Sequence, residues 1–371
     1  MPTPKFHFSG KSSPEIFVGR IGYPNINHGI LAPSENDNLS NFATAEDWSK
    51  NNFSIENILR IRGGLVHGKT KTNIKSTSKI KKISEILTLS SRPVSTEFFL
   101  KKKPSLEFIT SSIFRPMTNP APLQKVVLEE NPKVEKKVDY ITSDTSVLAN
   151  NAIKELYDSK ISVDHLQKLL SIGLLGKKSS RKMVPTAWSI TATDDIVSIE
   201  LLNKIKYYKE ENEIKLFSGV FVGNYIEILV LPGAFSFEAI EVWGDESVPL
   251  ESSKFYQDYE SFHGRKVYAK NITGGYYAMR LGATEYLGRT KRQAKILSFR
   301  LITKDYYAPL GVGVVREVAR RAFNSPPKIF DSIDEALKEM ENKLGIKAQK
   351  IKQKSWTLNH EIKQKSLRNF F

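Results

Sequence analysis

The sequence contains no cysteine among its 371 residues, which excludes disulfides, thiolate zinc sites, iron–sulfur clusters and a cysteine nucleophile. Histidine is also scarce, and none of the six residues lie at the H-x-x-x-H spacing of helical zinc ligands. No apolar run approaches the roughly 18 residues of a membrane span. The first residues also lack the apolar core of a signal peptide. We therefore expect a soluble, cytoplasmic protein that does not contact a membrane.

Acidic residues are few relative to basic ones. The sequence has 40 Asp and Glu against 56 Lys and Arg, a formal net charge of +16. This excess indicates a polyanionic partner, and without an amphipathic helix rich in lysine and aromatics we expect DNA rather than lipid. The alternative for the helical arginines is a solvated helix face. The candidate phosphate contacts are Lys69, Lys71, Lys81, Lys82, Arg181, Lys182, Arg289, Arg292, Arg316 and Arg320.

The spacing of apolar residues predicts an α+β protein with a β-rich middle region, a helical C-terminal region and a flexible basic tail. Residues 1–60 are rich in Pro, Asn, Ser and Gly and are expected to be mostly loop. The main α+β domain is placed at 61–275 and the helical domain at 276–345. Residues 346–371 have few apolar side chains, so we expect a tether that does not fold alone.

Individual elements are predicted from local patterns. Ser332 and Glu335 form a capping box that opens a helix to about Leu344. Glycines at 173 and 176 mark the end of an earlier helix. The remaining predictions are strands at 94–100, 216–222, 225–231, 235–243 and 267–269, a strand that begins at 183 and ends before Asp194, and helices at 149–157, 163–175, 276–302 and 313–323.

The last eight residues carry the most specific motif, Q-x-x-L-x-x-F-F, which resembles the peptide by which partner proteins dock on the sliding clamp PCNA. In one 3₁₀ turn the leucine and the first phenylalanine fall on the same side, and the glutamine offers an amide at the pocket edge. Burying the three apolar side chains contributes about 6 kcal/mol before ordering costs, consistent with micromolar affinity. The alternative is that both phenylalanines pack on the protein's own surface. The motif is Gln364, Lys365, Ser366, Leu367, Arg368, Asn369, Phe370 and Phe371.

A pair of adjacent carboxylates follows the strand predicted from residue 183. Carboxylates at a strand end commonly hold Mg²⁺ or Mn²⁺ in nucleases, through hard oxygen ligands. The alternatives are a turn or helix N-cap for the pair, and solvent exposure for acids on strands. The candidate ligands are Asp194, Asp195, Asp258 and Glu260, and Glu238 and Glu241 lie in a neighbouring β-like segment.

Several segments resemble the archaeal Nre family of DNA repair proteins. The strongest match covers residues 181–192, with Asp194 and Asp195 just after it. The resemblance implies a role in the archaeal response to DNA damage and recruitment by the clamp. The chain departs from the family in lacking the four-cysteine zinc cluster of some members, so no zinc finger is expected, and in having Ala187 where arginine is frequent. The other matching segments are 17–24, 90–94, 170–176, 274–278 and 309–317.

The sequence is therefore interpreted as a cytoplasmic, nucleoid-associated DNA repair factor that binds DNA and docks on PCNA. Two alternatives stay open. A divalent-metal nuclease would show metal-dependent cleavage that is lost on substitution of Asp195 by Asn. A non-catalytic adaptor would bind the clamp with little affinity for DNA at moderate salt.

Overall fold

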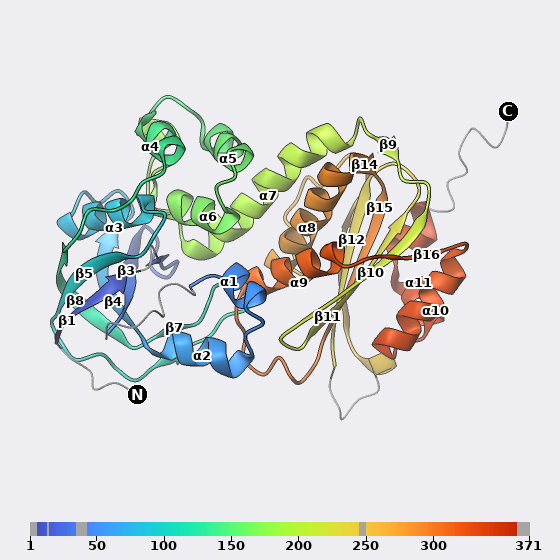
Figure 1. Ribbon diagram of the computed structural model, residues 1–371, viewed down its shortest axis with the longest axis horizontal. Helices are drawn as coiled ribbons and strands as arrows, with labels where there is room; N and C mark the ends of the chain where they lie inside the picture. The colour runs from blue at the N-terminus through green and yellow to red at the C-terminus, as the bar shows by residue number, and fades with distance from the viewer. Residues whose placement is uncertain (1–5, 13–14, 35–42, 245–249, 362–371) are drawn as a thin grey trace. The chain divides into compact units, whose positions relative to one another are not determined.

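The computed structural model describes residues 6–12, 15–34, 43–244 and 250–361. Its contacts divide the chain into two compact units (Figure 1). Unit 1 comprises residues 1–197 and 308–313, and unit 2 comprises residues 198–307 and 314–371. No helix in the described part is long and apolar enough to cross a membrane. The fold is mixed α+β, with strands in the N-terminal and middle regions and helices toward the C-terminus, as predicted.

Unit 1 is built on a six-stranded sheet with the order β1-β5-β8-β4-β3-β2. Its neighbouring strands are antiparallel except β4 and β8, which are parallel. The strand predicted at 94–100 is confirmed as β5, and its residues alternate between buried and half-buried. The bounds are β1 (His7–Ser12), β2 (Ile16–Val18), β3 (Asn25–Pro33), β4 (Leu65–Asn73), β5 (Val94–Leu100) and β8 (Pro120–Leu128), with a separate pair, β6 (Phe108–Ile109) and β7 (Met117–Thr118).

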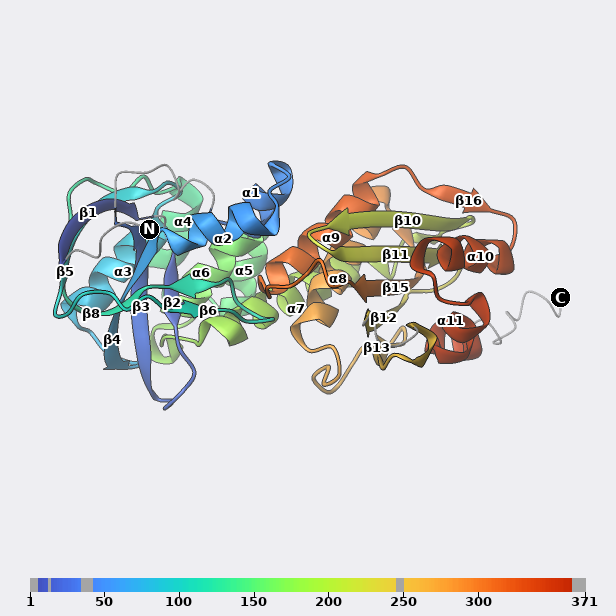
Figure 2. The same cartoon turned by 90° about the horizontal axis from the view of Figure 1, so that it is seen from below.

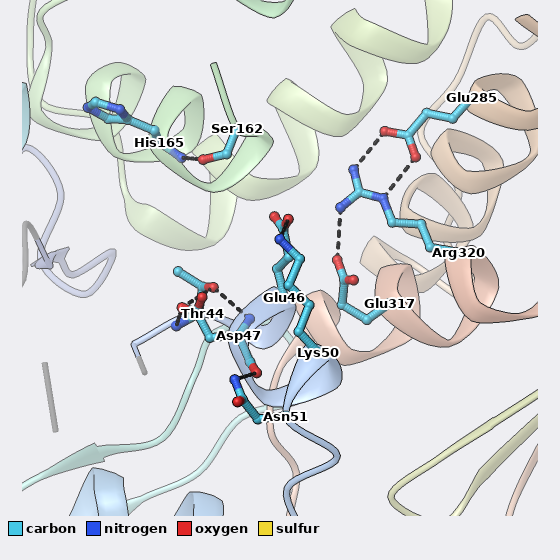
Figure 3. A network of polar contacts seen from close by, with 10 residues as sticks. All are labelled: Thr44, Glu46, Asp47, Lys50, Asn51, Ser162, His165, Glu285, Glu317 and Arg320. Atoms are coloured by element: carbon cyan, nitrogen blue, oxygen red, sulfur yellow. Dashed lines mark hydrogen bonds and ion pairs between the residues drawn. The ribbon is translucent and has the colours of Figure 1, made fainter. Parts of the chain in front are cut away.

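The helices of unit 1 begin at capping residues. Thr44 and Asp47 form a reciprocal capping box at the start of α1, drawn in Figure 3. The predicted helix end at Gly173 is confirmed, because this residue is left-handed (φ 86°) and a Cβ there would lie 2.6 Å from the Lys182 carbonyl oxygen. Residues of α3 and α6 share the core of the sheet. The bounds are α1 (Ala45–Lys50), α2 (Ile55–Gly63), α3 (Lys79–Leu89), α4 (Lys136–Ser143), α5 (Ala149–Asp158), α6 (Val163–Ile172), a 3₁₀ turn (Lys178–Ser180) and α7 (Thr186–Ile205), which continues into unit 2.

Unit 2 is built on a second six-stranded sheet, and Figure 2 shows its strands in the order β13-β12-β15-β11-β10-β16. Only β12 and β15 are parallel neighbours. The strands predicted at 216–222, 225–231 and 235–243 are confirmed as β10, β11 and β12. The bounds are β10 (Ile214–Phe221), β11 (Asn224–Leu231), β12 (Ser236–Trp243), β13 (Phe255–Glu260), β15 (Lys295–Ile302) and β16 (Lys328–Phe330), with a separate pair, β9 (Lys209–Glu210) and β14 (Arg292–Gln293).

Helices cover both faces of the unit 2 sheet (Figure 1). Leu229, Leu297 and Phe299 pack with Leu337 of α10 on one face. On the other face lie α8 and α9. The helices predicted at 313–323 and after Ser332 are confirmed, since Ser332 accepts a hydrogen bond from the Glu335 amide. The bounds are a 3₁₀ turn (Leu250–Ser252), α8 (Gly274–Thr290), α9 (Val312–Asn324), α10 (Ile333–Leu344), α11 (Ala348–Lys354) and a π-helical turn (Thr357–Glu361).

Two predicted elements have the wrong type. The strand predicted from residue 183 is the first half of α7, where Ala187, Ile190, Asp194 and Val197 are buried at helical spacing. Its many β-branched residues imitate a strand. The helix predicted over 276–302 ends at left-handed Lys291, and β15 follows. Because β15 is buried on both faces, periodicity alone does not separate it from a helix.

Three regions are assigned differently by the structure. Residues 1–60, expected to be mostly loop, form β1, β2, β3, α1 and the start of α2 in their described part. Residues 264–270 form no strand, and the edge strand is β13 instead. The described part of the expected tether, residues 346–361, is folded, because Ile346, Ile351 and Leu358 are buried in the unit 2 core. Its few apolar side chains suffice since all three face the sheet.

Candidate functional site

A half-enclosed pocket lies in unit 1. The space between its walls is about 420 Å³, including the part that is open to solvent. One part of the lining is apolar, and there the rings of Phe17 and Phe114 meet edge to face at 5.0 Å. The rest is polar and comes mainly from α6 and the first turn of α7. The apolar lining is Ile16, Phe17, Leu31, Phe114, Met117 and Ile190, and the polar lining is Glu15, Arg115, Gln167, Lys168, Ser171, Thr186 and Ser189.

Local hydrogen bonds hold the polar wall in place. After α6 ends at Gly173 the chain returns to α7, and Ser171 Oγ donates to the Val184 carbonyl at 2.8 Å. The Val18 amide of β2 donates to Thr186 Oγ1 at 2.9 Å. The consecutive helices α6 and α7 and the distant strand β2 are thus fixed around the pocket.

The wall that carries Phe114 is supported by residues 308–313, which belong to unit 1. The Val312 amide donates to the Ile113 carbonyl at 3.0 Å, and Leu310 forms a β-bridge with Ser111. Gly311 is left-handed (φ 89°), and a Cβ there would lie 2.7 Å from the Phe114 carbonyl carbon. Only glycine fits at this approach.

Five charged side chains form a network beside the pocket, which we call the Glu15 network: the buried Glu15, Arg62 and Lys168 and the half-buried Arg115 and Asp164. Arg62 Nη1 lies 2.6 Å from Glu15 Oε2, and Arg115 Nε lies 3.6 Å from Glu15 Oε1. Arg115 Nη2 and Lys168 Nζ lie 2.9 and 2.7 Å from the two oxygens of Asp164. Three basic groups therefore face two carboxylates, a local excess of one positive charge.

The electrostatics of the network follow from burial and pairing. Burial would raise the pKa of Glu15, but Arg62 and Arg115 outweigh it, and the pKa of Glu15 is lowered. Burial would also lower the pKa of Arg115, which Asp164 and Glu15 nevertheless raise. Glu15 and Arg115 therefore both stay charged at neutral pH. One donor is unsatisfied: Arg62 is fully buried and its Nη2 has no hydrogen-bond partner.

Sequence reasoning missed this network, and the available signal was weak. Arg62 lies near Ile58 and Ile61 on the buried side of α2, and Lys168 lies between buried residues of α6. The signal that could have indicated the network was a basic residue at a helical position whose neighbours on the same face are apolar. Of the predicted metal ligands, Asp194 is connected to the pocket, because Gln167 Nε2 donates to its Oδ1 at 3.2 Å.

Two other predicted metal ligands, Asp258 and Glu260, lie in unit 2 and are held by arginines. Asp258 Oδ1 is 3.0 Å from Arg265 Nη2, and Glu260 Oε2 is 3.0 Å from Arg280 Nη1. Asp194 and Asp195 lie within α7 and do not follow a strand. Across the described ranges, no three His, Asp or Glu side chains form a group that could hold a metal ion. The Mg²⁺ or Mn²⁺ site stays a prediction.

The predicted phosphate contacts fall into two groups. Several arginines hold the fold: Arg181 donates to three backbone carbonyls, Arg316 is buried, and Arg320 pairs with Glu285 and Glu317, as Figure 3 shows. Arg289 and Arg292 also donate to backbone carbonyls, and Lys81 pairs with Glu85. The remaining candidates lie on β4, α3 and the turn before α7. They are Lys69, which is half-buried, and the exposed Lys71, Lys82 and Lys182.

The predicted clamp peptide, residues 364–371, lies outside the described residues. The segment just before it is anchored to β12 by the buried carboxylate of Glu238. Its oxygens accept hydrogen bonds from Ser355 Oγ at 2.7 Å, the Trp356 amide at 2.8 Å and the Thr357 amide at 2.9 Å. The Trp356 ring stacks on Tyr259 at 4.5 Å. Only residues 362 and 363 separate the last described residue from the motif.

Comparisons with known proteins cover nearly the whole chain. The family model described as "Archaeal Nre, N-terminal" matches residues 3–248, and the model described as "Archaeal Nre, C-terminal" matches residues 260–370. The DNA repair protein NreA of Archaeoglobus fulgidus is 34% identical over 97% of this chain and 89% of its own length. DNA repair protein NreB of the same organism is 31% identical over 97% and 91%, and NreA of Haloferax volcanii is 31% identical over 93% and 85%. No solved structure matches the chain.

Proposed function

Because the chain belongs to the archaeal Nre family, we propose that it is a DNA repair factor that binds DNA and is recruited to PCNA through residues 364–371. The curated relatives are named DNA repair proteins, which supports the repair role. DNA binding, clamp docking and a cytoplasmic location on the chromosome are the finer parts of this proposal.

The observation that carries clamp docking is the four-position match to Q-x-x-L-x-x-F-F immediately after an anchored segment. Three peptide steps join Glu361 to Gln364, a reach of at most about 11 Å. A docked clamp would in turn raise the local concentration of the whole protein at DNA.

The direct test is calorimetric titration of an archaeal PCNA with the full chain and with a chain ending at Lys363. We expect micromolar binding that disappears on truncation. Two double variants keep the length of the chain and separate the motif positions from the positions between them. Leu367→Ala with Phe370→Ala removes two apolar side chains of the motif, whereas Lys365→Ala with Arg368→Ala changes only intervening positions. Unchanged binding by the first pair would refute the assignment of these residues.

The DNA-binding part is supported by the net charge of +16 and by exposed lysines such as Lys71, Lys82 and Lys182. Binding through phosphates predicts an affinity that falls steeply with salt for any duplex sequence. Clamp binding without measurable DNA affinity at moderate salt would identify an adaptor instead. Cleavage of the DNA in Mg²⁺ or Mn²⁺ that Asp195→Asn abolishes would identify the nuclease alternative.

A further inference from the structure

We propose that an exposed patch on unit 1 binds single-stranded DNA by stacking its bases on aromatic rings. The patch, which we call the Tyr23–Trp188 patch, consists of Arg20, Ile21, Tyr23, Lys182 and Trp188. The inference rests on the proposed function, because it presumes a protein that binds DNA. It goes further in naming the surface and the form of DNA that this surface takes.

Two exposed aromatic side chains meet in the patch. The ring centroids of Tyr23 and Trp188 are 5.4 Å apart, with an angle of 47° between the ring planes. Tyr23 is 40% exposed and Trp188 is 48% exposed, so both remain accessible to a ligand. Ile21 belongs to the same turn as Tyr23 and is 86% exposed. Large apolar residues that are exposed singly are normal, whereas a group of them with a polar rim marks an interaction site.

Backbone hydrogen bonds hold the two rings in place. In the turn between β2 and β3, the Tyr23 amide donates to the Arg20 carbonyl at 3.4 Å, and Gly22 is left-handed (φ 80°). Trp188 lies in the first turn of α7, where its amide donates to the Pro185 carbonyl at 2.8 Å. The hydrogen bond from β2 to the start of α7 joins the two segments. Rings that are already held in position lose little entropy when a base stacks on them.

Basic side chains lie on the segments that meet at these rings. The Ile74 amide donates to the Pro24 carbonyl at 3.0 Å, and the Met183 amide donates to the Ile74 carbonyl at 2.9 Å. No Asp or Glu occurs in the segments joined in this way, which are 18–27, 69–75 and 181–192. Their exposed cations are Arg20, Lys71, Lys75 and Lys182. A surface of this charge attracts a polyanion.

The combination of rings and cations favours a single strand over a duplex. Phosphates are complementary to the basic side chains, but they make no use of the exposed rings or of Ile21. Every base has a π-face on which an aromatic ring can stack, and in a duplex these faces are covered by the neighbouring base pairs. Proteins that bind single strands without sequence preference combine stacking rings with a cationic track. The Tyr23–Trp188 patch has both.

Fluorescence anisotropy with two labelled DNA probes tests the patch. The probes are an oligothymidylate of about 15 nucleotides, near the upper site size of single-strand binding folds, and a duplex of the same length. We expect Trp188→Ala to weaken single-strand binding about tenfold and to leave duplex binding unchanged, because one stacked base is lost. Trp188→Phe keeps a ring and should retain most of the affinity. The matched control is Trp243→Ala in unit 2, since Trp243 is also 48% exposed.

The salt dependence separates stacking from phosphate contacts. Arg20→Ala with Lys182→Ala should reduce the slope of log affinity against log salt concentration by about 1.4, since each phosphate contact to a single strand contributes about 0.7. Trp188→Ala should lower the affinity without changing this slope, because stacking on a base releases no counterions. A changed slope in the tryptophan variant would contradict the stacking role.

Photo-crosslinking of the native chain decides the case in which a tryptophan variant does not fold. With 5-iodouracil in the oligothymidylate, we expect crosslinks in peptides that contain Tyr23 or Trp188. Crosslinks confined to other peptides would overturn the proposal, as would unchanged single-strand affinity in Trp188→Ala or an equal loss for both probes. Duplex binding without single-strand binding would overturn the proposal and leave the proposed function intact. Binding of neither probe would refute the DNA-binding function and the proposal together.

Discussion

Substitution of Glu238 by Gln is expected to release the segment that begins at Ser355 from the unit 2 sheet. The carboxylate is fully buried and accepts from Ser355, Trp356 and Thr357, and also from Gln257 Nε2. Each carboxylate oxygen receives two of these four donors. An amide keeps one oxygen and places an NH₂ group against the two donors that faced the other.

The magnitude follows from counting bonds. Hydrogen bonds to a charged group contribute about 1.5–3 kcal/mol each. Losing two of them lowers the free energy of local opening by about 3–6 kcal/mol. Since 1.4 kcal/mol is a factor of ten, amide protection across residues 355–361 should fall by about a hundredfold or more.

Hydrogen–deuterium exchange followed by mass spectrometry measures this directly. We expect faster exchange in peptides covering residues 350–361 and unchanged exchange in peptides of β10 and β11. Glu213→Gln is the matched control, because that carboxylate is 43% exposed and pairs with Lys215 at 3.0 Å. Unchanged protection at 355–361 would refute the anchor, and equal loss of protection across all of unit 2 would show that the effect is not local.

Three further predictions concern pH and salt. Burial raises the pKa of Glu227 to about 7 from 4.5, so the folded protein retains a proton that the unfolded chain releases, and stability falls by up to about 3 kcal/mol as pH rises from 4.5 to 7. In urea unfolding, the Glu227→Gln variant should not lose stability over this pH range. If the stability of the variant and of the native chain changed with pH in parallel, the prediction would be wrong. Burial lowers the pKa of His28 to about 4 and of His67 to about 3, so the unfolded chain binds protons first as pH falls below 6.5. The stability of unit 1 should drop on acidification, and His28→Leu should reduce the slope by about 1.4 kcal/mol per pH unit, whereas an unchanged slope would refute the assignment. The double variant Lys71→Ala with Lys82→Ala should bind DNA more weakly at low salt, and the slope of log affinity against log salt concentration should decrease by the contribution of about two phosphate contacts. Fluorescence anisotropy measures both quantities, and an unchanged affinity for PCNA is the control.

The sequence predicted elements wherever one local signal decided the outcome. The strand at Val94–Leu100 has strict alternation, and the helix after Ser332 has a capping side chain. Prediction failed where tertiary burial overrode local preference. The start of α7 is rich in β-branched residues, and β15 is buried on both faces because helices cover both sides of the unit 2 sheet (Figure 1).

The candidate site shows the same division. The proposed clamp motif is linear, so a prediction of its four positions needs only neighbouring residues of the sequence. The Glu15 network could not, because Glu15 and Arg62 are 47 positions apart and meet only through the fold. Nothing in the neighbourhood of either residue in the sequence indicates the other.

The support of Phe114 by residues 308–313 bears on how such a chain can be inherited. The N-terminal family match ends at residue 248, yet unit 1 needs Leu310 and Val312, which lie within the C-terminal match. Recombination that joined the N-terminal half to an unrelated C-terminal half would remove the contacts of Leu310 and Val312 that support the wall of the pocket carrying Phe114. The N-terminal and C-terminal halves are therefore expected to occur together in genomes and to co-evolve, and not to be exchanged as separate modules.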